Sequence, residues 1–382
     1  MKVVLVSRFP ADTDNPRGGV ETATLALARG LVTEGIELHI VTIESGINSE
    51  QTENQEGITV HRLPRSGWPM FADVFGGPSI KRLNQRLSAL QPDVVHYHET
   101  WGFSAPRCGF PAVFTVHGFD SLNLPTERPP FWRARSLVWQ MAEHRGLAPQ
   151  RHIISIAPYV TNQISPHTNA HIYEIWNALS ISNYEQPRDR EGMRVLFLGW
   201  LNPRKNPLVL VKALPALAAR FPDIKLELVG EASDEDYFTK LQQEITQLGV
   251  AEHVELPGRL PQSAVRDRLQ KASVLVLPSL QENAPMVIAE AMAIGVPVVA
   301  TNVCGIPDMI ENNTTGILLD DPYDETEVAE AISRAIGDDT LNNTMGLAAV
   351  ARANDLFHPK VVAARTLDVY RAAISDFGNE SH

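Results

Sequence analysis

The stretch SVLVLPSLQENAPMVIAEAMAIGVPVVAT, residues 273–301, has the pattern of a strand, a turn, a helix and a second strand. The runs SVLVLPS (273–279) and VPVVAT (296–301) are short and apolar, as is typical of buried strands in a parallel sheet. Between them, Pro285 suits the first position of a helix, and Gly295 suits the position after its last residue. The sequence therefore predicts a helix in this interval, with its N-terminus close to the end of the first strand.

Two glutamates stand in this otherwise apolar unit. Glu282 lies in the turn before the helix, and Glu290 lies inside the helix between two alanines. Burying a carboxylate without partners costs on the order of several kcal/mol. A local arginine or backbone group would satisfy Glu290, and so would the vicinal diol of a bound ribose, and the residues alone leave both open. The free N–H groups at the helix N-terminus would suit a phosphate.

Strand and helix patterns alternate along the rest of the chain. In the first half, the expected elements are strand 2–7, helix 21–35, strand 37–43, helix 81–93 and strands 93–98, 111–118 and 152–157. The second half repeats the pattern with strand 193–199, helix 208–222, strand 225–230, helix 234–250, strand 253–258 and helix 263–272. This alternation is typical of parallel, doubly wound sheets, whose ligands bind beyond the carboxyl ends of the strands.

A polar segment without apolar periodicity, SISNYEQPRDREG (180–192), separates the two halves. We therefore expect an α/β protein with two Rossmann-like, doubly wound domains that face a central cleft. The expected divisions are an N-terminal domain over 1–183, a linker over 184–192, a C-terminal domain over 193–360, and a C-terminal helix and tail over 361–382 that packs back on the N-terminal domain.

The bulk composition limits the class of protein. The chain has 382 residues, enough for two cores, and 44% of them are hydrophobic and 20% charged, as in ordinary globular proteins. No apolar run approaches the ~20 residues of a membrane-spanning helix, and MKVVLVSRFP (1–10) is interpreted as a strand and not as a signal peptide. The two cysteines, Cys108 and Cys304, lie in different halves, which argues against a disulfide framework and fits a reducing compartment. We therefore expect a cytoplasmic protein.

The formal net charge of −12 comes from 33 basic and 45 acidic residues, and no basic stripe stands out, so nucleic acid is not expected as a partner. One segment, ERPPFWRARSLVWQMAEHRG (127–146), combines four arginines with Phe131, Trp132 and Trp139. A segment of this composition can rest on the anionic inner face of a membrane. A surface helix with its tryptophans anchored in the core would have the same composition, and both interpretations stay open.

Glu282 and Glu290, with seven residues between them, resemble the E-x7-E signature of the retaining glycosyltransferases of family GT4, which have the GT-B fold. The resemblance covers nearly the whole chain and is most specific over 281–319. The other motifs that carry it are PRGGVE (16–21), DVVHYH (93–98), FTVHGFD (114–120), GWLNPRKNP (199–207) and ELPGRLP (255–261). The resemblance implies that the first domain binds an acceptor and the second a nucleotide sugar, with no metal ion and no cofactor.

The resemblance also implies roles for individual residues. Glu290 would bind the ribose hydroxyls, Glu282 the hydroxyls of the transferred sugar, and Lys205 the leaving diphosphate. His117 would lie between donor and acceptor and would hydrogen-bond the transferred sugar. Gly258, Arg259 and Leu260 would lie near the nucleotide base. The expected catalytic residues are thus His117, Lys205 and Glu282, and the expected donor-binding residues are Gly18, Gly19, Arg204, Gly258, Arg259, Leu260, Asn283, Ala284, Pro285, Met286, Val287 and Glu290.

Several of these residues have simpler interpretations when each is taken alone. Gly18 and Gly19 would also suit a plain turn. Lys205 would also suit a solvated surface position, and His117 a strand end where its hydrogen bonds are satisfied. The choice between these interpretations depends on which side chains the fold brings together.

Three places in the sequence have residue types that bind metal ions in other proteins. His96 and His98 share one strand face, as a metal-binding pair would, but no third ligand is evident. The acidic motifs DTD (12–14) and DED (234–236) lie in segments that look solvated. Because the resemblance also implies an enzyme of the GT-B type, which generally needs no bound metal, we expect that activity does not require a metal ion.

Two positions depart from the family pattern. Trp200 stands where the family usually has an arginine, directly after the glycine that ends a strand, so a second phosphate cation is missing from its usual place. Arg17 or Arg204 would be the substitute. Cys304 precedes Gly305 where the family usually has two glycines.

The expected function is therefore that of a retaining glycosyltransferase acting in glycan, polysaccharide or glycolipid synthesis. It would move a hexose-type sugar from a UDP-, GDP- or ADP-sugar to a hydroxyl of a sugar, glycan or glycolipid acceptor. Retention by a front-side mechanism is implied by the resemblance alone. The alternatives are a GT-B-fold isomerase of the 2-epimerase type, which needs no acceptor, and a non-catalytic nucleotide-sugar binder.

Overall fold

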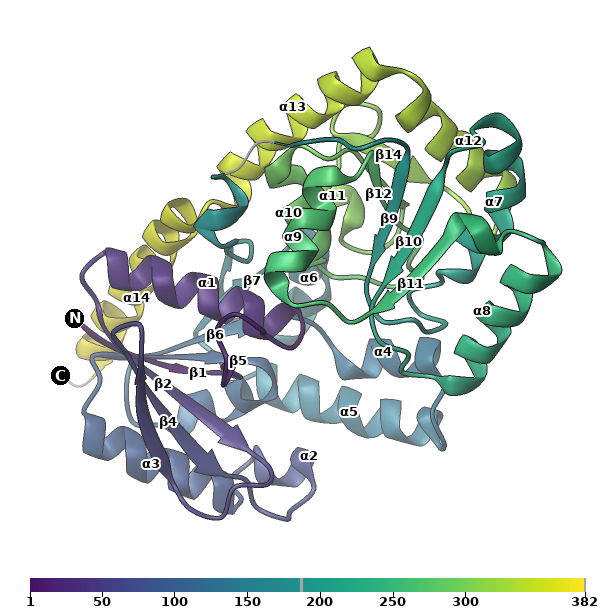
Figure 1. The fold of residues 1–382 in the computed structure, drawn as a ribbon. Coiled ribbons are helices and arrows are strands. Elements are labelled where there is room, and N and C mark those ends of the chain that lie inside the picture. Colours follow the sequence, from purple (N-terminus) through teal and green to yellow (C-terminus); the bar gives the residue numbers. More distant parts are fainter. Residues whose placement is uncertain (186–187, 381–382) are drawn as a thin grey trace. The chain divides into compact units, whose positions relative to one another are not determined.

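A computed structural model describes residues 1–185 and 188–380. Gln186 and Pro187, in the expected linker, and Ser381 and His382, in the expected tail, lie outside the described residues. The chain divides into two compact units (Figure 1): the first comprises residues 1–180 with 357–382, and the second comprises residues 181–356. Each unit is an α/β domain around its own largely parallel sheet.

The sheet of the first unit has eight strands among the described residues, in the order β3-β4-β2-β1-β5-β6-β7-β8. Every neighbouring pair is parallel except β3 and β4. The strands are β1 (Lys2–Val6), β2 (Glu37–Glu44), β3 (Gln51–Gln55), β4 (Ile58–Pro64), β5 (Val94–His98), β6 (Ala112–Val116), β7 (His152–Ser155) and β8 (His171–Glu174). The sequence patterns missed β3, β4 and β8. Strand β3 has the polar sequence QTENQ because it is an exposed edge strand with no apolar face to bury.

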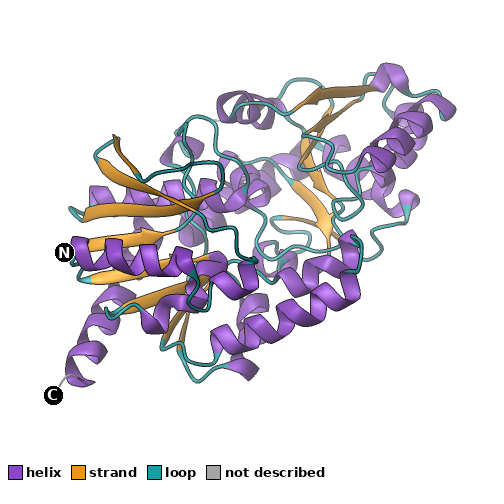
Figure 2. Cartoon of the chain, turned by 90° about the horizontal axis from the view of Figure 1, so that it is seen from below, coloured by secondary structure: helices purple, strands orange, loops and turns teal. Residues whose placement is uncertain are grey.

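Helices cover both faces of this sheet (Figure 2). They are α1 (Gly19–Thr33), α2 (Met70–Asp73), α3 (Pro78–Leu90), α4 (Asp120–Glu127), α5 (Trp132–Leu147), α6 (Pro158–Ile164) and α14 (Pro359–Glu380), with 3-10 turns at Glu99–Arg107 and Ser165–His167. Helix α14 packs against α1, although more than 300 residues separate them in sequence. A Cβ atom on Gly30 would lie 3.1 Å from the carbonyl oxygen of Pro359, so glycine is what permits this close approach.

The sheet of the second unit has six parallel strands among the described residues, in the order β11-β10-β9-β12-β13-β14. They are β9 (Arg194–Leu198), β10 (Lys225–Val229), β11 (Val254–Gly258), β12 (Val274–Leu277), β13 (Val298–Thr301) and β14 (Gly316–Leu319). The helices are α7 (Leu208–Arg220), α8 (Glu235–Gln247), α9 (Gln262–Lys271), α10 (Met286–Ile294), α11 (Ile306–Met309), α12 (Glu325–Gly337) and α13 (Asp339–Phe357), with 3-10 turns at Ile181–Asn183 and Ala251–His253. Every strand and helix predicted in this half is present, with ends shifted by a few residues.

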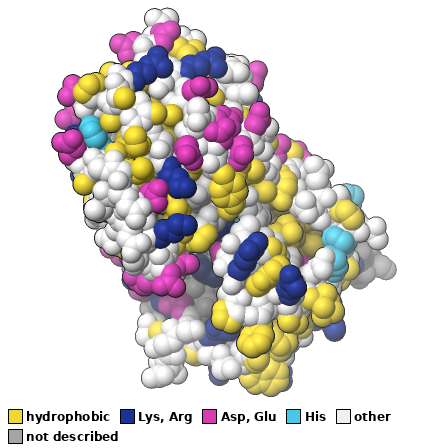
Figure 3. Space-filling model, turned by 90° about the vertical axis from the view of Figure 1, so that its right-hand side faces the viewer, with side chains coloured by type: hydrophobic (Ala, Val, Ile, Leu, Met, Phe, Trp, Pro, Cys, Tyr) yellow, Lys and Arg dark blue, Asp and Glu magenta, His cyan; other side chains and the backbone are white. Residues whose placement is uncertain are grey.

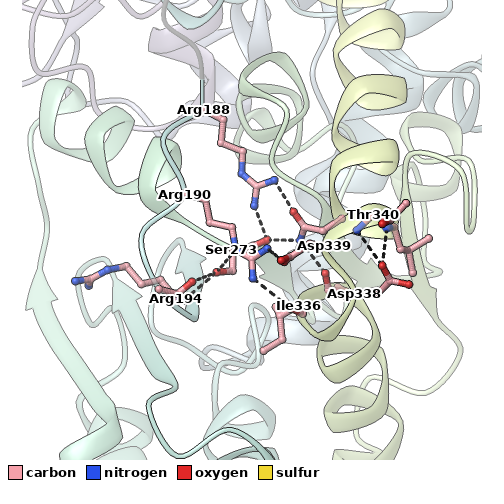
Figure 4. A network of polar contacts seen from close by, with 12 residues as sticks. Arg188, Arg190, Arg194, Ser273, Ile336, Asp338, Asp339 and Thr340 are labelled. Carbon is pink, nitrogen blue, oxygen red and sulfur yellow. Dashed lines mark hydrogen bonds and ion pairs between the residues drawn. The ribbon is translucent and has the colours of Figure 1, made fainter.

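Two arginines fix the described part of segment 184–192 within the second unit (Figure 4). Arg188 donates to the carbonyl oxygen of Ser273 (2.8 Å) and to the side-chain oxygen of Asn342 (2.6 Å). Arg190 donates to the carboxylate of Asp339 (2.6 Å). Burial, with Arg190 nearby, lowers the pKa of Arg188 to about 10. These bonds attach Arg188 and Arg190 to the residue before β12 and to α13. The described residues of this segment are therefore bound to the second unit.

The surface agrees with the composition. On the face of the described residues drawn in Figure 3, Lys and Arg side chains are scattered among acidic and apolar ones and form no broad basic area. Within residues 1–185 and 188–380, no helix is long and apolar enough to cross a membrane.

Candidate functional site

The strand order of the second unit brings two loops together. Strand β9 lies between β10 and β12. After β9 the chain adds β10 and β11 on one side of it, and then crosses to the other side to add β12, β13 and β14. At such a switch point, the loops that follow the two central strands open a crevice at the carboxyl edge of the sheet. Here these loops are 199–207, after β9, and 278–285, after β12. The N–H of Leu280 donates to the carbonyl oxygen of Arg204 (2.8 Å), which joins the two loops directly.

Two cations of the first loop meet the first glutamate of the E-x7-E pair. The ammonium group of Lys205 donates to the carboxylate of Glu282. A guanidinium nitrogen of Arg204 lies 3.9 Å from the same carboxylate and donates to the carbonyl oxygen of Gln281 (3.2 Å). All three charged side chains are less than a fifth exposed. The simpler interpretation of Lys205 as a solvated lysine is therefore wrong.

Asn202 determines the path of this loop. Its side-chain oxygen accepts from the backbone N–H of Lys205 (3.0 Å), and its carbonyl oxygen accepts from the N–H of Asn206 (3.1 Å). The side-chain nitrogen of Asn202 donates to Ser233 (3.0 Å). The loop thus forms a tight turn, from which the side chain of Lys205 reaches the carboxylate of Glu282.

Helix α10 begins at the same edge of the sheet. Met286 is its first residue, and Pro285 is the N-cap with φ −66° and ψ 118°. The prediction of Pro285 at the first helical position is therefore wrong by one residue, because its ψ is extended. The N–H groups of Met286 and Val287 belong to the first turn, where no intrahelical acceptor exists. Gly295 ends the helix with φ 86°, as predicted.

The turn before α10 rests on a glycine from another loop. The N–H of Gly305 donates to the carbonyl oxygen of Glu282 (3.0 Å). A Cβ atom on Gly305 would lie 1.7 Å from the carbonyl oxygen of Asn283, so only glycine fits. Asn283 and Ala284 are half-buried in this turn. Cys304 has φ 51°, in the left-handed region that favours glycine, which gives a physical reason for the glycine usual at this position.

Glu290 is buried inside α10, only 7% exposed. Its carboxylate accepts one long hydrogen bond, from the amide of Gln262 at the start of α9 (3.4 Å). Burial raises the pKa of Glu290 to about 7, and the positive charge of Arg266 acts against this rise. A single long contact from Gln262 is a weak compensation for a buried carboxylate.

The predicted base-contacting residues lie next to Gln262 in sequence. Gly258 ends β11 with φ 73°, and its carbonyl oxygen accepts from the N–H of Gly230 (3.0 Å). Arg259 is exposed and Leu260 is half-buried. The start of α9 therefore connects this segment to Glu290, and the contact of these residues with a base stays a prediction.

Trp200 is 45% exposed and follows Gly199, whose φ is 157°. A Cβ atom on Gly230 would lie 1.8 Å from the carbonyl oxygen of Gly199, so the two strand ends lie against each other. The exposure of Trp200 leaves room for another long side chain at this position.

The remaining predicted site residues belong to the first unit. Gly18, with φ 88°, is the N-cap of α1, and Gly19 is the first residue of that helix. A Cβ atom on Gly18 would meet nothing within 4 Å. Glycine is therefore favoured at this position by the positive φ and not by a close contact with other described residues. His117 follows the end of β6 and lies beside His98 at the end of β5, with Nε2 of His117 2.8 Å from Nδ1 of His98. Burial lowers the pKa of both rings.

The histidines of strand β5 are engaged with other side chains. The rings of His96 and His98 lie with centroids 4.2 Å apart, and His96 is hydrogen-bonded to Tyr370 and Thr115. Over residues 1–185 and 188–380, no group of three or more His, Cys, Asp or Glu side chains has an arrangement that would hold a metal ion. Independence from metal stays a prediction.

The structure thus groups the predicted residues in two places. Arg204, Lys205 and Glu282 meet in the second unit near the start of α10, whereas Gly18, Gly19 and His117 lie in the first unit. Four supporting residues were not anticipated as site residues: His98, Asn202, Gln262 and Gly305. For His98 a sequence signal existed, because two neighbouring parallel strands each end in histidine. For the other three the partner becomes visible only in the fold.

Comparison with known proteins agrees with this organisation. A family model described as "Glycosyl transferases group 1" matches residues 184–352, and one described as "Glycosyltransferase Family 4" matches residues 17–182. A D-inositol 3-phosphate glycosyltransferase from Arthrobacter sp. (strain FB24) is 28% identical over 393 residues, covering 94% of this chain and 91% of that protein. One from Streptomyces griseus is 35% identical over 197 residues, covering 49% of this chain and 40% of that protein.

Solved structures show the same fold. Sucrose-phosphate synthase from Thermosynechococcus elongatus has a TM-score of 0.78 at 19% identity, over 98% of this chain and 99% of that chain. HepE from Anabaena in complex with UDP-glucose has a TM-score of 0.73 at 18% identity, over 97% of this chain and 100% of that chain. The predicted GT-B fold is confirmed by these likenesses. With family models covering both halves, the chain belongs to the group 1 glycosyltransferases of family GT4.

Proposed function

We propose that the chain is a retaining hexosyltransferase that takes a sugar from a nucleotide-sugar donor and transfers it to a hydroxyl acceptor. The observation that carries the proposal is the meeting of Lys205, Arg204 and Glu282 beside the first turn of α10. Two cations and free helix N–H groups offer positive potential for a diphosphate. Glu282 is a hydrogen-bond acceptor for sugar hydroxyls.

The proposed chemistry follows from this arrangement. The bond between the anomeric carbon and the diphosphate oxygen breaks, and negative charge accumulates on the leaving group. Lys205 and the N–H groups of Met286 and Val287 stabilise that charge, which is the term that contributes most in such reactions. The acceptor oxygen then bonds to the anomeric carbon from the same face, and its proton passes to the departing phosphate. Retention and the absence of a protein nucleophile are part of the proposal.

The donor and acceptor are to be identified by assay. UDP-glucose is the first donor to test, because the related HepE structure contains it. GDP- and ADP-sugars complete the donor panel. The acceptor panel is D-inositol 3-phosphate, named by the curated relatives, together with simple sugars, glycans and glycolipids. A saturating donor, at 100 times its dissociation constant, should raise the free energy of unfolding by about 2.7 kcal/mol.

Product analysis separates the alternatives. A new glycoside whose anomeric configuration by NMR equals that of the donor supports the proposal, and an inverted product refutes retention. An epimerised nucleotide sugar formed without acceptor would indicate a 2-epimerase. Binding without any product across the panel would indicate a nucleotide-sugar binder.

We propose further that no metal ion takes part. Activity should survive an excess of EDTA, with a matched sample to which Mg²⁺ is restored as the control. Complete loss on chelation, reversed by Mg²⁺ or Mn²⁺, would contradict this and direct attention to the carboxylates at 12–14 and 234–236.

A last element of the proposed function is contact with an anionic membrane in the cytoplasm through residues 127–146. Phe131, Leu137 and Met141 are each more than half exposed, and Arg133 and Arg135 are exposed on the same helix end. Exposed apolar side chains flanked by arginines suit a membrane interface. Sedimentation with vesicles containing phosphatidylglycerol should retain the protein, and the double variant Leu137→Ser/Met141→Ser should reduce this binding. Equal binding to neutral vesicles would argue against the charge contribution.

A further inference from the structure

One face of helix α9 lies toward the buried carboxyl of Glu290. Gln262 is the first residue of α9, and its amide nitrogen donates to Oε1 of Glu290 (3.4 Å). Arg266 follows four residues later, and residues four apart in a helix lie on the same face. Arg266 is therefore one helical turn along α9 from the contact with Glu290.

A second element fixes the guanidinium group of Arg266. This group donates to the hydroxyl of Ser182 (2.6 Å) and to the side-chain oxygen of Asn183 (3.4 Å). Both residues belong to the 3-10 turn Ile181–Asn183. This turn and α9 each pack against α10, the helix that carries Glu290. Two sets of contacts within the second unit thus hold Arg266 near that helix.

The hydrogen-bond partners of Arg266 are neutral. The hydroxyl of Ser182 and the amide of Asn183 carry no charge, and within residues 1–185 and 188–380 no carboxylate forms an ion pair with Arg266. A cation that is not neutralised by a partner favours the ionised form of a nearby carboxyl. The pKa of Glu290 reflects this: burial raises it to about 7, and the positive charge of Arg266 acts against the rise.

Arg266 is the charged side chain that these elements bring to Glu290. Among the described residues, α10 packs mainly against α9, β12, β13 and the turn 181–183. The two strands, VLVL and VVAT, and the turn contain no titratable side chain. The other charged side chains of α9, and the glutamate in the turn before α10, have partners of their own: Arg268 with Glu227, Lys271 with Asp267, and Glu282 with Lys205.

We propose that Arg266 is a positioning residue of the nucleotide site: fixed by the turn 181–183, its guanidinium group keeps the carboxyl of Glu290 ionised as the acceptor for two ribose hydroxyls. A carboxylate has two acceptor oxygens, whereas one oxygen of a neutral carboxyl carries the proton. A vicinal diol with two O–H donors therefore selects the ionised form, and the proton of Glu290 passes to the solvent when the nucleotide binds. The inference rests on the proposed function for the contact between Glu290 and ribose.

The electrostatic link can be measured without any nucleotide. The full chain, labelled with ¹³C at the glutamate side-chain carboxyls, is titrated from pH 5 to pH 9 by carbon NMR, and Glu290→Gln assigns the signal. Arg266→Met removes the charge and keeps an aliphatic side chain. The pH at which half of the Glu290 carboxyl is ionised should be higher in Arg266→Met than in wild type. Equal midpoints overturn the proposal, whatever reaction the protein catalyses.

Nucleotide affinity should follow the same ionisation. Calorimetry with UDP-glucose suits this test, because its diphosphate is esterified at both ends and lacks the ionisation of a terminal phosphate at about pH 6. With a pKa of about 7 for Glu290, wild-type affinity should rise by up to about tenfold from pH 6 to pH 8. Arg266→Met should bind about 3- to 10-fold more weakly than wild type at pH 7 and approach its affinity at pH 9.

Two further variants separate charge from structure. Lys271→Met removes a positive charge from the same helix at a more exposed position, and it should leave the midpoint and the affinity unchanged. Arg266→Lys keeps the charge and should restore most of the wild-type pH profile. A loss of affinity in Arg266→Met that is the same at every pH would indicate a structural role and refute the proposal.

The remaining outcomes are also decisive. If Arg266→Met does not fold, Ser182→Ala takes its place, because it removes the 2.6 Å acceptor of the guanidinium group and should raise the midpoint of Glu290 by a smaller amount. Nucleotide affinity that does not depend on pH in wild type would refute the positioning role and the ribose contact together. If no nucleotide sugar of the donor panel binds, the proposed function is refuted, and the titration still decides whether Arg266 acts on Glu290.

Discussion

The ammonium group of Lys205 donates to the carboxylate of Glu282, and this pair joins the loops after β9 and β12. The two residues are 77 positions apart in sequence. Lys205 is 12% exposed and Glu282 8%, so each needs the other or a ligand to offset the cost of burial. Under the proposed function, a bound diphosphate would replace Glu282 as the partner of Lys205, and Glu282 would then accept hydrogen bonds from sugar hydroxyls.

Lys205→Ala should lower kcat by about 10²–10³, because charge on the leaving group grows toward the transition state. KM for the donor should change much less. Steady-state kinetics measure both constants. Lys240→Ala, which removes an exposed lysine on α8, is the matched control. Wild-type turnover in Lys205→Ala would contradict the assignment of the whole segment 199–207.

Trp200→Arg should partly restore kcat in the Lys205→Ala background. The position is 45% exposed, so an arginine has room, and a guanidinium there would supply positive charge where the family usually has it. The readout is kcat of the double variant against that of Lys205→Ala alone. Without any recovery, residue 200 does not face the phosphates.

Glu290→Gln should change how the free energy of unfolding depends on pH. Burial raises the pKa of Glu290 from 4.5 to about 7. Between these values the folded protein keeps a proton that the unfolded chain has released. The stability contributed by the neutral carboxyl is therefore complete below pH 4.5 and is lost as the pH rises through 7.

Glutamine does not titrate, so the variant should gain stability relative to wild type between pH 5 and pH 8, by up to about 3 kcal/mol. Denaturant unfolding at several pH values measures the difference. A difference that is the same at every pH would show that the carboxyl does not titrate in this range.

Glu290→Ala should weaken nucleotide binding by roughly 1.5–3 kcal/mol, the usual cost of losing a hydrogen bond to a charged group. Calorimetry with the nucleoside diphosphate measures the loss. Gln262→Ala, which removes the partner of Glu290 inside the protein, should affect binding less. Unchanged affinity in a folded Glu290→Ala protein would contradict the ribose assignment.

Gly305→Ala should displace the turn that carries Glu282 and Asn283, because the new Cβ atom would lie 1.7 Å from the carbonyl oxygen of Asn283. We expect a large fall in kcat with a folded protein by circular dichroism. Gly67→Ala is the matched control, since a Cβ atom there meets nothing within 4 Å. Full activity in Gly305→Ala would show that the turn can move without loss.

The parts of the fold that could be predicted from the sequence were those with a local residue pattern. Buried parallel strands are continuous apolar runs, so 2–7, 193–199 and 273–279 could be assigned without knowing their neighbours. The edge strand β3 was not predicted, because its sequence, QTENQ, is polar on both faces and has no apolar pattern. Helix α13 was not delimited, whereas the C-terminal helix expected within 361–382 corresponds to α14 (Pro359–Glu380). The bounds of the two compact units appear only when long-range contacts are known.

The sequence by itself determined the alternation of strands and helices, the family, and the residue types of the site, because these depend on neighbours in the chain and on motif spacing. Tertiary structure decided which of those residues act on one another. Lys205 and Glu282 meet because β9 and β12 are adjacent at a switch in strand order, and His98 and His117 meet because β5 and β6 are. Strand adjacency results from burying both faces of a whole sheet, and no short segment encodes it. The chemistry of each side chain was therefore in the sequence, whereas its partner and its burial were set by the fold.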